Sequence, residues 1–294
     1  MKATSTCLGV LLLLAACGGD DSDGGHDGSG DADADPDQPD GGPLSAQIFD
    51  HAHIGAEDIP SGCLDQLKSG DFVFHYAHRS HGSQIIVGAD SLEADLADLQ
   101  FEASYCSVPG GSDILKMWDG MTDNNLVEQD QYWASDGGLD ELRGILGDNP
   151  ELTYSMWAWS FEINEQTESS VQDYLDAMDM LESEFPGVRF IYMTGPAASD
   201  PFMAVNNAER NAQIRAYAEA NGKLLFDFEE LDTFSGGENH TEVIDGETIP
   251  YEHPDFDLDT DGNSEYEFTH TTQASCEQKA RAFWGMLAAL ECGG

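Results

Sequence analysis

Five apolar runs that alternate with amphipathic stretches constrain the fold of this chain more than any other feature of its sequence. Strands that alternate with helices form parallel sheets through right-handed crossovers. We therefore expect an α/β fold, with about five parallel strands in a single doubly wound sheet. The strand-like runs cover residues 72–76, 101–106, 153–160, 188–194 and 224–228. The stretches with helical spacing cover residues 90–100, 139–146, 168–185, 206–221 and 279–290.

The amino terminus, residues 1–16, has the pattern of an export signal. Lys2 precedes an apolar run, residues 8–16, that is too short to span a bilayer, which takes about 20 residues. The run leads into LAAC, residues 14–17, which looks like a bacterial lipobox, so we expect cleavage before Cys17 and a lipid on its thiol. An ordinary signal peptide with a chance cysteine is the alternative. The prediction is an exported protein of the bacterial cell envelope that touches a membrane only through this anchor.

The formal charge of −46, from 57 acidic and 11 basic residues, is extreme. Such a surface repels nucleic acid and anionic lipid headgroups, so we expect no nucleic-acid partner. Solubility in a medium whose salt screens the self-repulsion explains the charge without a specific ligand. Residues 17–43 consist mainly of Gly, Asp and Pro, and we expect a disordered acidic tether there. Residues 44–294 are then expected to form one monomeric α/β domain.

A polar cluster follows the first strand-like run, within residues 72–86. The run ends in HRSHGSQ, residues 78–84. The carboxyl ends of strands in an open α/β sheet are where such proteins place their chemistry. Ser80 is therefore the candidate nucleophile, with Ser83 as its rival. The histidines of the cluster, His78 and His81, are expected to shape a pocket or to bond the backbone.

The HRSHGSQ cluster resembles the serine block of a divergent SGNH/GDSL-type hydrolase group. The likeness continues, in the same order, through WDGM, SMWAWS, FIYMTG, LLFDFEEL and KARAFWGMLAAL, and so covers residues 48–290. The usual Gly-Asp-Ser is absent from this chain. The resemblance implies a flavodoxin-like sheet of SGNH type and a serine esterase that needs no cofactor for catalysis.

The resemblance also assigns roles to residues far apart in the sequence. His270 stands before the last helix, where the family keeps its general base, and Glu267 has the spacing of the acid that orients this base. The oxyanion hole would use the N–H groups of Ser80 and Gly120 and the side chain of Asn164. The substrate would be a small-molecule or polysaccharide ester, for example an acetylated polysaccharide. A non-catalytic surface binding module that keeps the fold is the alternative.

The acidic segment 229–269 shows no convincing helix or strand, and long loops inside compact domains are often functional. Aspartates at alternate positions, followed by a glycine, resemble the first half of a calcium loop. The twelfth position is Phe268 rather than the glutamate of an EF-hand. We expect a structural calcium ion there, with a solvated acidic turn as the alternative. The candidate ligands are Asp257, Asp259, Asp261, Asn263 and Glu265.

His51 and His53 form a His-x-His pair at the start of the globular part. Such a pair near a strand can begin a metal site of amidohydrolase type, but that architecture needs eight strands with further ligands at their ends. We therefore expect His51 and His53 to be surface histidines, and a metal-dependent hydrolase is the least favoured hypothesis.

Four cysteines lie in the globular part: Cys63, Cys106, Cys276 and Cys292. In an oxidising compartment they would form two disulfides, with three pairings open. Cys276 and Cys292 bracket the last helix, and 16 residues at about 1.5 Å each put them about 24 Å apart. A disulfide tolerates roughly 7 Å between Cα atoms. If the helix is continuous, Cys276 is expected to pair with Cys63 or Cys106.

Overall fold

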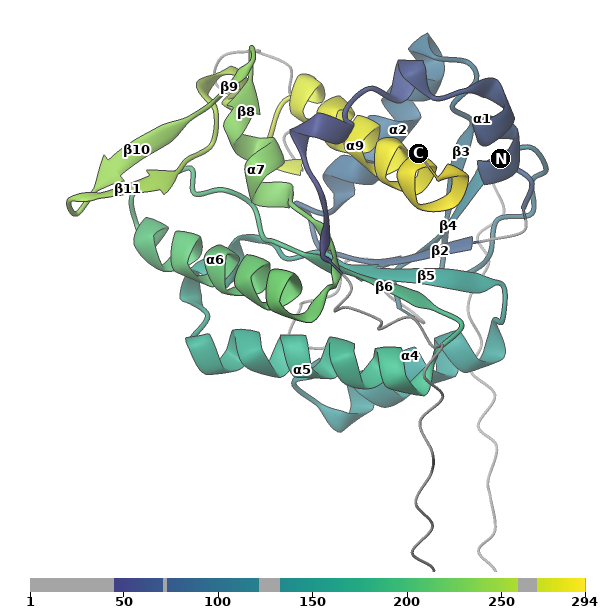
Figure 1. The fold of residues 1–294 in the computed structure, drawn as a ribbon, viewed down its shortest axis with the longest axis horizontal. Helices are drawn as coiled ribbons and strands as arrows, with labels where there is room; N and C mark the ends of the chain where they lie inside the picture. The colour runs from purple at the N-terminus through teal and green to yellow at the C-terminus, as the bar shows by residue number, and fades with distance from the viewer. Residues whose placement is uncertain (1–44, 71–72, 122–132, 259–268, 294) are drawn as a thin grey trace, which may run out of the picture. The chain divides into compact units, whose positions relative to one another are not determined.

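The computed structural model describes residues 45–70, 73–121, 133–258 and 269–293. The segment Leu44–Gly294 forms one compact unit around a parallel sheet (Figure 1). Seven strands pair in the order β1-β7-β6-β5-β2-β4-β3. The expected α/β class with a parallel sheet is confirmed, with seven strands instead of about five. The strands are β1 Gln47–Phe49, β2 Val73–Ala77, β3 Phe101–Tyr105, β4 Leu115–Asp119, β5 Leu152–Trp157, β6 Arg189–Met193 and β7 Leu224–Phe226.

Strand β4 is not among the five strand-like runs that the sequence displays. It pairs in parallel with β2 on one side and β3 on the other. Leu115, Met117 and Trp118 are buried, whereas Lys116 lies at the partly exposed position between them. The run is short and carries a lysine, so its apolar content alone does not mark it as a buried strand.

Helices cover both faces of the sheet (Figure 1). One face carries α1 Ser61–Leu67, α2 Ser83–Asp95, α7 Phe228–Thr233 and α9 Gln273–Cys292. The other carries α4 Asp136–Asp148, α5 Glu168–Glu184 and α6 Ala204–Asn221. Among the described residues, the 3-10 turns are η1 His51–His53, η2 Ala56–Asp58, η3 Phe161–Glu165 and η4 Pro254–Phe256. This two-sided cover is the doubly wound arrangement that the alternation of strands and helices predicts.

Strand β2 occupies the centre of the sheet, between β4 and β5, and all five of its residues are buried. The chain leaves β2 for β3 and β4 on one side, and then continues through β5, β6 and β7 on the other. The direction of winding therefore changes at β2. In open α/β sheets, the crevice outside the carboxyl ends of the strands at such a switch point is where ligands bind.

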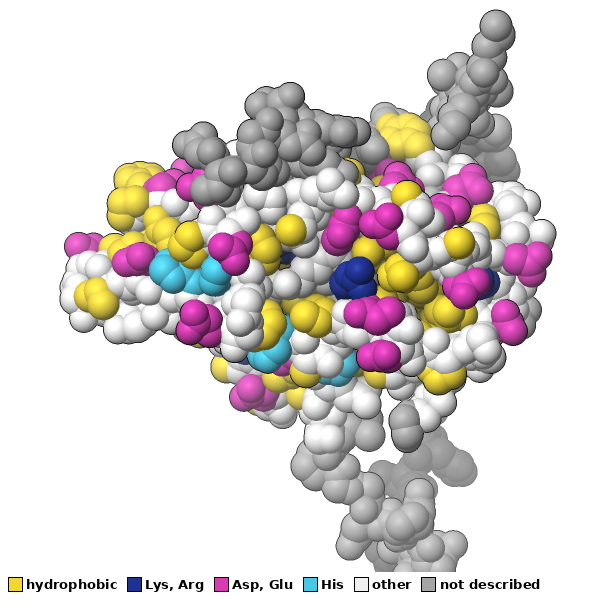
Figure 2. Space-filling model, turned by 90° about the horizontal axis from the view of Figure 1, so that it is seen from above, with side chains coloured by type: hydrophobic (Ala, Val, Ile, Leu, Met, Phe, Trp, Pro, Cys, Tyr) yellow, Lys and Arg dark blue, Asp and Glu magenta, His cyan; other side chains and the backbone are white. Residues whose placement is uncertain are grey.

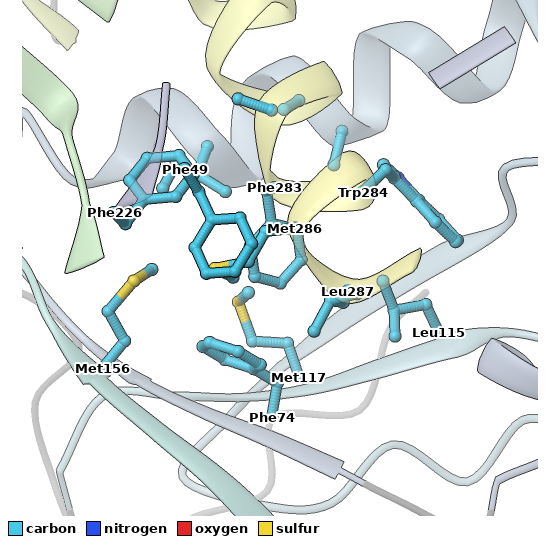
Figure 3. Packing of buried hydrophobic residues seen from close by; sticks show 14 of the residues in the cluster. Phe49, Phe74, Leu115, Met117, Met156, Phe226, Phe283, Trp284, Met286 and Leu287 are labelled. Carbon is cyan, nitrogen blue, oxygen red and sulfur yellow. The ribbon is translucent and has the colours of Figure 1, made fainter. Parts of the chain in front are cut away.

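The core between the sheet and α9 is built from large side chains that interdigitate (Figure 3). The Phe74 ring of β2 meets the Phe283 ring of α9 edge to face, with 4.9 Å between the ring centroids. Met117 of β4 and Leu287 of α9 belong to the same cluster. Burial of such side chains contributes about 1.5–3 kcal/mol each, so α9 is held firmly on the sheet.

Helix α2 begins at Ser83, earlier than the helix predicted from residue 90. Two glycines explain why sequence propensity hides this start. A Cβ on Gly82 would lie 2.4 Å from His78 Cβ, and one on Gly88 would lie 2.0 Å from the Cys276 carbonyl oxygen. Both positions require glycine for close packing, although glycine is a poor helix former. Gly88 therefore lets α2 and α9 approach backbone to backbone.

The acidic segment after β7 contains more structure than its sequence predicts. Helix α7 begins directly after β7, and two small antiparallel pairs follow it, β8 Phe234–Ser235 with β9 Glu238–Asn239 and β10 Thr241–Ile244 with β11 Glu247–Pro250. The expectation of an unstructured loop over residues 229–269 is therefore wrong for residues 229–258. The antiparallel pairs are short and largely exposed, so hydrophobic periodicity does not reveal them.

The disulfide joins Cys63 of α1 to Cys292 at the end of α9, with 5.8 Å between the Cα atoms. Helix α9 is continuous, and Cys276 and Cys292 at its two ends are not paired, as expected. The prediction that Cys276 pairs with Cys63 or Cys106 is wrong, because Cys63 pairs with Cys292. Cys276 and Cys106 are buried thiols, with Cys106 in the hydrophobic cluster on the α4–α5 side of the sheet and Cys276 on α9 across from it.

Acidic side chains are spread over the surface, and Figure 2 shows one face on which few basic groups lie between them. Within the described residues, none of the helices has the length and apolar character required to cross a bilayer.

Candidate functional site

Ser80 and His270 meet at the carboxyl end of β2, although 190 residues separate them in the sequence. The hydroxyl Oγ of Ser80 lies 2.9 Å from Nε2 of His270. Ser80 is half-buried in the turn between β2 and α2, and His270 lies in the turn before α9. The structure thus brings together the two residues that the sequence predicts as nucleophile and base. A serine hydroxyl at this distance from an imidazole nitrogen can pass its proton to the ring.

Buried threonines on both sides hold the turn that carries His270. The backbone φ of His270 is +63°, a left-handed conformation that costs energy in a residue other than glycine. The carbonyl of Thr269 accepts a hydrogen bond of 2.7 Å from Gln84 Nε2, and Thr271 Oγ1 donates to the Phe256 carbonyl at 3.3 Å. The side chain of Thr272 caps α9 directly afterwards. These contacts fix an unfavourable backbone conformation, which aims the imidazole at Ser80.

Burial lowers the pKa of His270 below its ordinary value of 6.5. The neutral imidazole, which is the form that accepts a proton, therefore persists to more acidic pH than in a free histidine. The ring of His81 stacks on that of His270, with 4.7 Å between centroids and an interplanar angle of 21°. Burial first, and then the nearby His270 and Lys279, lower the pKa of His81 to about 3, so His81 is neutral at physiological pH.

His81 also pairs with a second serine at the same sheet edge. Its Nδ1 lies 2.6 Å from Oγ of Ser160, which follows β5. Ser160 is only 2% exposed, so a substrate carbonyl cannot reach its hydroxyl. The His81–Ser160 contact therefore ties the turn after β2 to the end of β5. This fits the prediction that His81 shapes the site.

His78 anchors the backbone that leads to Ser80. Its Nδ1 donates to the Arg79 carbonyl at 2.8 Å, and its Nε2 lies 2.7 Å from Oδ1 of Asp119 at the end of β4. The backbone-bonding role predicted for His78 is confirmed. The rival nucleophile Ser83 is buried beside this pair, with its Oγ 3.4 Å from both His78 Nδ1 and the Arg79 carbonyl. Ser83 thus faces the pair rather than the surface.

One of the two remote donors predicted for the oxyanion hole, the Gly120 N–H, is engaged elsewhere. The N–H of Gly120, at the end of β4, donates to the Tyr76 carbonyl at 2.8 Å. The side-chain oxygen of Asn164 in η3 accepts from Asn207 Nδ2 of α6 at 2.6 Å, which turns this oxygen toward α6. The prediction that Gly120 is an oxyanion donor is therefore wrong for this conformation. The backbone needs that N–H to join β4 to β2, and sequence spacing cannot reveal this requirement.

Several predicted residues lie outside the described part of the chain. They include the predicted acid of the triad, the lipidated cysteine and most of the calcium ligands: Glu267, Cys17, Asp259, Asp261, Asn263 and Glu265. Asp257, the first predicted ligand, is described and follows η4.

The two histidines at the start of the globular part do not converge on a common point. His51 Nδ1 contacts a carboxylate oxygen of Glu230, whereas His53 Nδ1 lies 3.4 Å from Asp50 Oδ1. Asp50, His51 and Glu230 could hold an ion, because their ligand atoms lie within 4.8 Å of one another. They follow β1 and β7, and β5, β6 and β7 separate β1 from the Ser80 strand. This cluster is thus remote from the Ser80–His270 pair.

Sequence reasoning missed three residues that surround the pair. Ser160 ends the apolar run SMWAWS, and that position was a usable signal, whereas Asp119 of WDGM ends a short run that contains Lys116 and is less easily recognised. Phe161 gives no such signal. Its side chain is 59% exposed, and its ring lies edge to face with His81 and His270, at 5.6 Å and 6.1 Å between centroids. An exposed aromatic ring beside a nucleophile offers a flat apolar contact to a substrate.

The chain matches no protein-family model, and comparison with curated proteins gives no match either. The geometry of the site and the motifs in the sequence are therefore the observations that bear on function.

Proposed function

We propose that this chain is a serine hydrolase of SGNH/GDSL type that cleaves carboxylic esters through Ser80 and His270. The contact of 2.9 Å between Ser80 Oγ and His270 Nε2 is the observation that carries the proposal. We further propose that the chain is exported and held at the bacterial cell envelope by a lipid on Cys17. Small-molecule esters and esterified polysaccharides are the proposed substrates, because the pair lies at an open sheet edge beside the exposed Phe161 ring.

In the proposed reaction, Nε2 of His270 takes the proton of Ser80 as the hydroxyl oxygen attacks the ester carbonyl carbon. The tetrahedral intermediate collapses when the imidazolium returns this proton to the leaving alcohol, and an acyl-serine remains. Water, activated by the same imidazole, then hydrolyses the acyl-serine and restores the enzyme. The Ser80 N–H remains the proposed oxyanion donor. A single such donor is worth about 3–4 kcal/mol of transition-state stabilisation.

Burial favours Ser80 over the other serines of the site. Ser160 and Ser83 are buried, and their hydroxyls contact His81 and His78 respectively, so both serve to hold the turn. Ser80 is half-buried and contacts His270, which is more exposed than His78 and His81. A nucleophile must be reached by both its base and its substrate, and Ser80 meets both conditions.

Hydrolysis of 4-nitrophenyl acetate by the purified protein tests the proposal. Ser80→Ala and His270→Ala should each lower kcat/KM by at least about 10³-fold, because either change removes half of the reacting pair. Ser83→Ala should stay within about threefold of the wild type. His51→Ala is the matched control, a histidine of the same unit far from the site, and should leave the rate unchanged. Full activity in Ser80→Ala would overturn the assignment.

One observation favours a second function, a binding module that keeps the fold without catalysis. The Gly120 N–H is committed to the Tyr76 carbonyl, so a complete oxyanion hole would need another donor in its place. This alternative would be favoured if the folded wild-type protein bound an ester ligand and did not hydrolyse aryl acetates.

A further inference from the structure

Gln84 connects the two halves of the proposed catalytic pair. It lies in the first turn of α2, four residues after Ser80, and its side chain is buried. Its Nε2 donates a hydrogen bond of 2.7 Å to the carbonyl of Thr269, the residue before His270. One side chain therefore joins the helix that follows the nucleophile to the turn that carries the base.

The local energetics indicate that stability alone does not account for a glutamine at this position. Within the described chain, Gln84 Oε1 is buried and has no hydrogen-bond partner. An unsatisfied buried acceptor reduces stability, and an apolar side chain of similar size would avoid that cost. The neighbouring His270 has a left-handed backbone, which is a second unfavourable feature. Unfavourable features that gather in this way are typical of functional sites.

The surrounding packing makes the connection rigid. Gly88 lies one turn after Gln84 on the same face of α2, and it brings α2 into backbone contact with α9 at Cys276. Gln84 thus acts between two helices whose separation is already fixed. The remaining freedom is the conformation of the turn that includes Thr269 and His270, and the Gln84 hydrogen bond restrains that turn.

We propose that Gln84 is a positioning residue, whose hydrogen bond to Thr269 holds the His270 imidazole at proton-transfer distance from Ser80. This inference rests on the proposed hydrolase function. Gln84 touches no reacting atom, so its loss should act on the chemical step and leave substrate binding largely unchanged. Positioning errors of about 1 Å can lower such rates by roughly 100-fold.

The test compares Gln84→Met with Gln278→Met, using kcat, KM and the melting temperature. Methionine keeps the length of the side chain and removes the donor. Gln278 of α9 is the matched control. Its Nε2 also donates to backbone carbonyls, those of Leu231 and Phe234, both at 2.8 Å. We expect kcat for 4-nitrophenyl acetate to fall about 10- to 100-fold in Gln84→Met at nearly constant KM. In Gln278→Met, kcat should remain within about twofold even if the melting temperature falls.

Gln84→Glu provides a second, nearly isosteric variant and a pH signature. An ionised carboxylate cannot donate to the Thr269 carbonyl, whereas a protonated carboxyl can. The rate of Gln84→Glu relative to the wild type should therefore rise as the pH falls. A merely structural role would show in the melting temperature without this pH dependence.

Two failures are distinguishable. An active wild type with normal kcat in folded Gln84→Met, or a pH-independent rate ratio for Gln84→Glu, would overturn the positioning role alone. A wild type without Ser80-dependent hydrolysis would overturn the proposed function and this inference together.

Discussion

The ion pair between Lys279 and Asp232 offers a quantitative test of how α9 is anchored. Lys279 is 0% exposed, and its ammonium nitrogen lies 2.5 Å from Asp232 Oδ1. The ammonium also lies 4.7 Å from the centre of the Phe228 ring. Asp232 accepts a further hydrogen bond from the Ala197 N–H at 3.0 Å. The pair connects α9 to α7 through groups that water does not reach.

Lys279→Met should destabilise the protein by about 3–5 kcal/mol, because it leaves the Asp232 carboxylate buried without its counter-charge. The methionine keeps most of the apolar stem, so the loss of charge dominates. Burial already raises the pKa of Asp232, and removal of Lys279 would raise it further. Proton uptake by Asp232 then relieves the cost at acidic pH, so the loss should be smaller at pH 5 than at pH 8.

Urea unfolding of the variant, followed by tryptophan fluorescence, gives this free energy if the slope m is unchanged. Arg281→Met is the control, since Arg281 lies two residues along α9 and pairs with the more exposed Glu57; its loss should cost about 0–1 kcal/mol. The double variant Lys279→Met/Asp232→Leu should recover most of the stability, since no charge is left unpaired. A loss below about 1 kcal/mol in Lys279→Met, or equal losses at both positions, would refute this account of α9.

Three further predictions follow from the site and its supports. The acid limb of the kcat/KM profile should have its midpoint below pH 6.5, because burial lowers the pKa of His270 and only the neutral imidazole accepts the serine proton; a midpoint above pH 7 would contradict this. Burial raises the pKa of Glu252 to about 8, so the folded state holds a proton that the unfolded state releases near 4.5. The free energy of unfolding should therefore decrease between about pH 5 and pH 8, by at most about 1.4 kcal/mol per pH unit from this group, and Glu252→Gln should flatten the slope. Peptide mapping without reduction should link Cys63 to Cys292, and a link between Cys63 and Cys276 would contradict the structure.

The sequence predicts the β–α alternation from local apolar patterns, whereas the approach of Ser80 to His270 is expected from the resemblance to the SGNH/GDSL-type group. Apolar runs of strand length mark β2, β5 and β6, and parallel strands must place their carboxyl ends at one edge. A polar residue directly after such a run is therefore a good candidate for the site. His270 follows no such run, and its place before the last helix becomes informative only through the resemblance.

Features that depend on tertiary packing could not be predicted in the same way. Strand β4 contains Lys116 and becomes recognisable as a strand only through its pairing with β2 and β3. Helix α2 begins before its clear apolar spacing because Gly82 and Gly88 serve close contacts with other segments. Gln84 and Gly120 have their roles through bonds to Thr269 and Tyr76, and the sequence alone does not show which residues those bonds join.

Covalent labelling by a fluorophosphonate, followed by peptide mass spectrometry, tests the central claim most directly. Such a reagent reacts with a serine whose hydroxyl is activated by a base. The account predicts a single adduct on Ser80, which forms in the wild type and is lost or greatly slowed in His270→Ala. An adduct on Ser83 or Ser160, or labelling of Ser80 at an equal rate without His270, would contradict it.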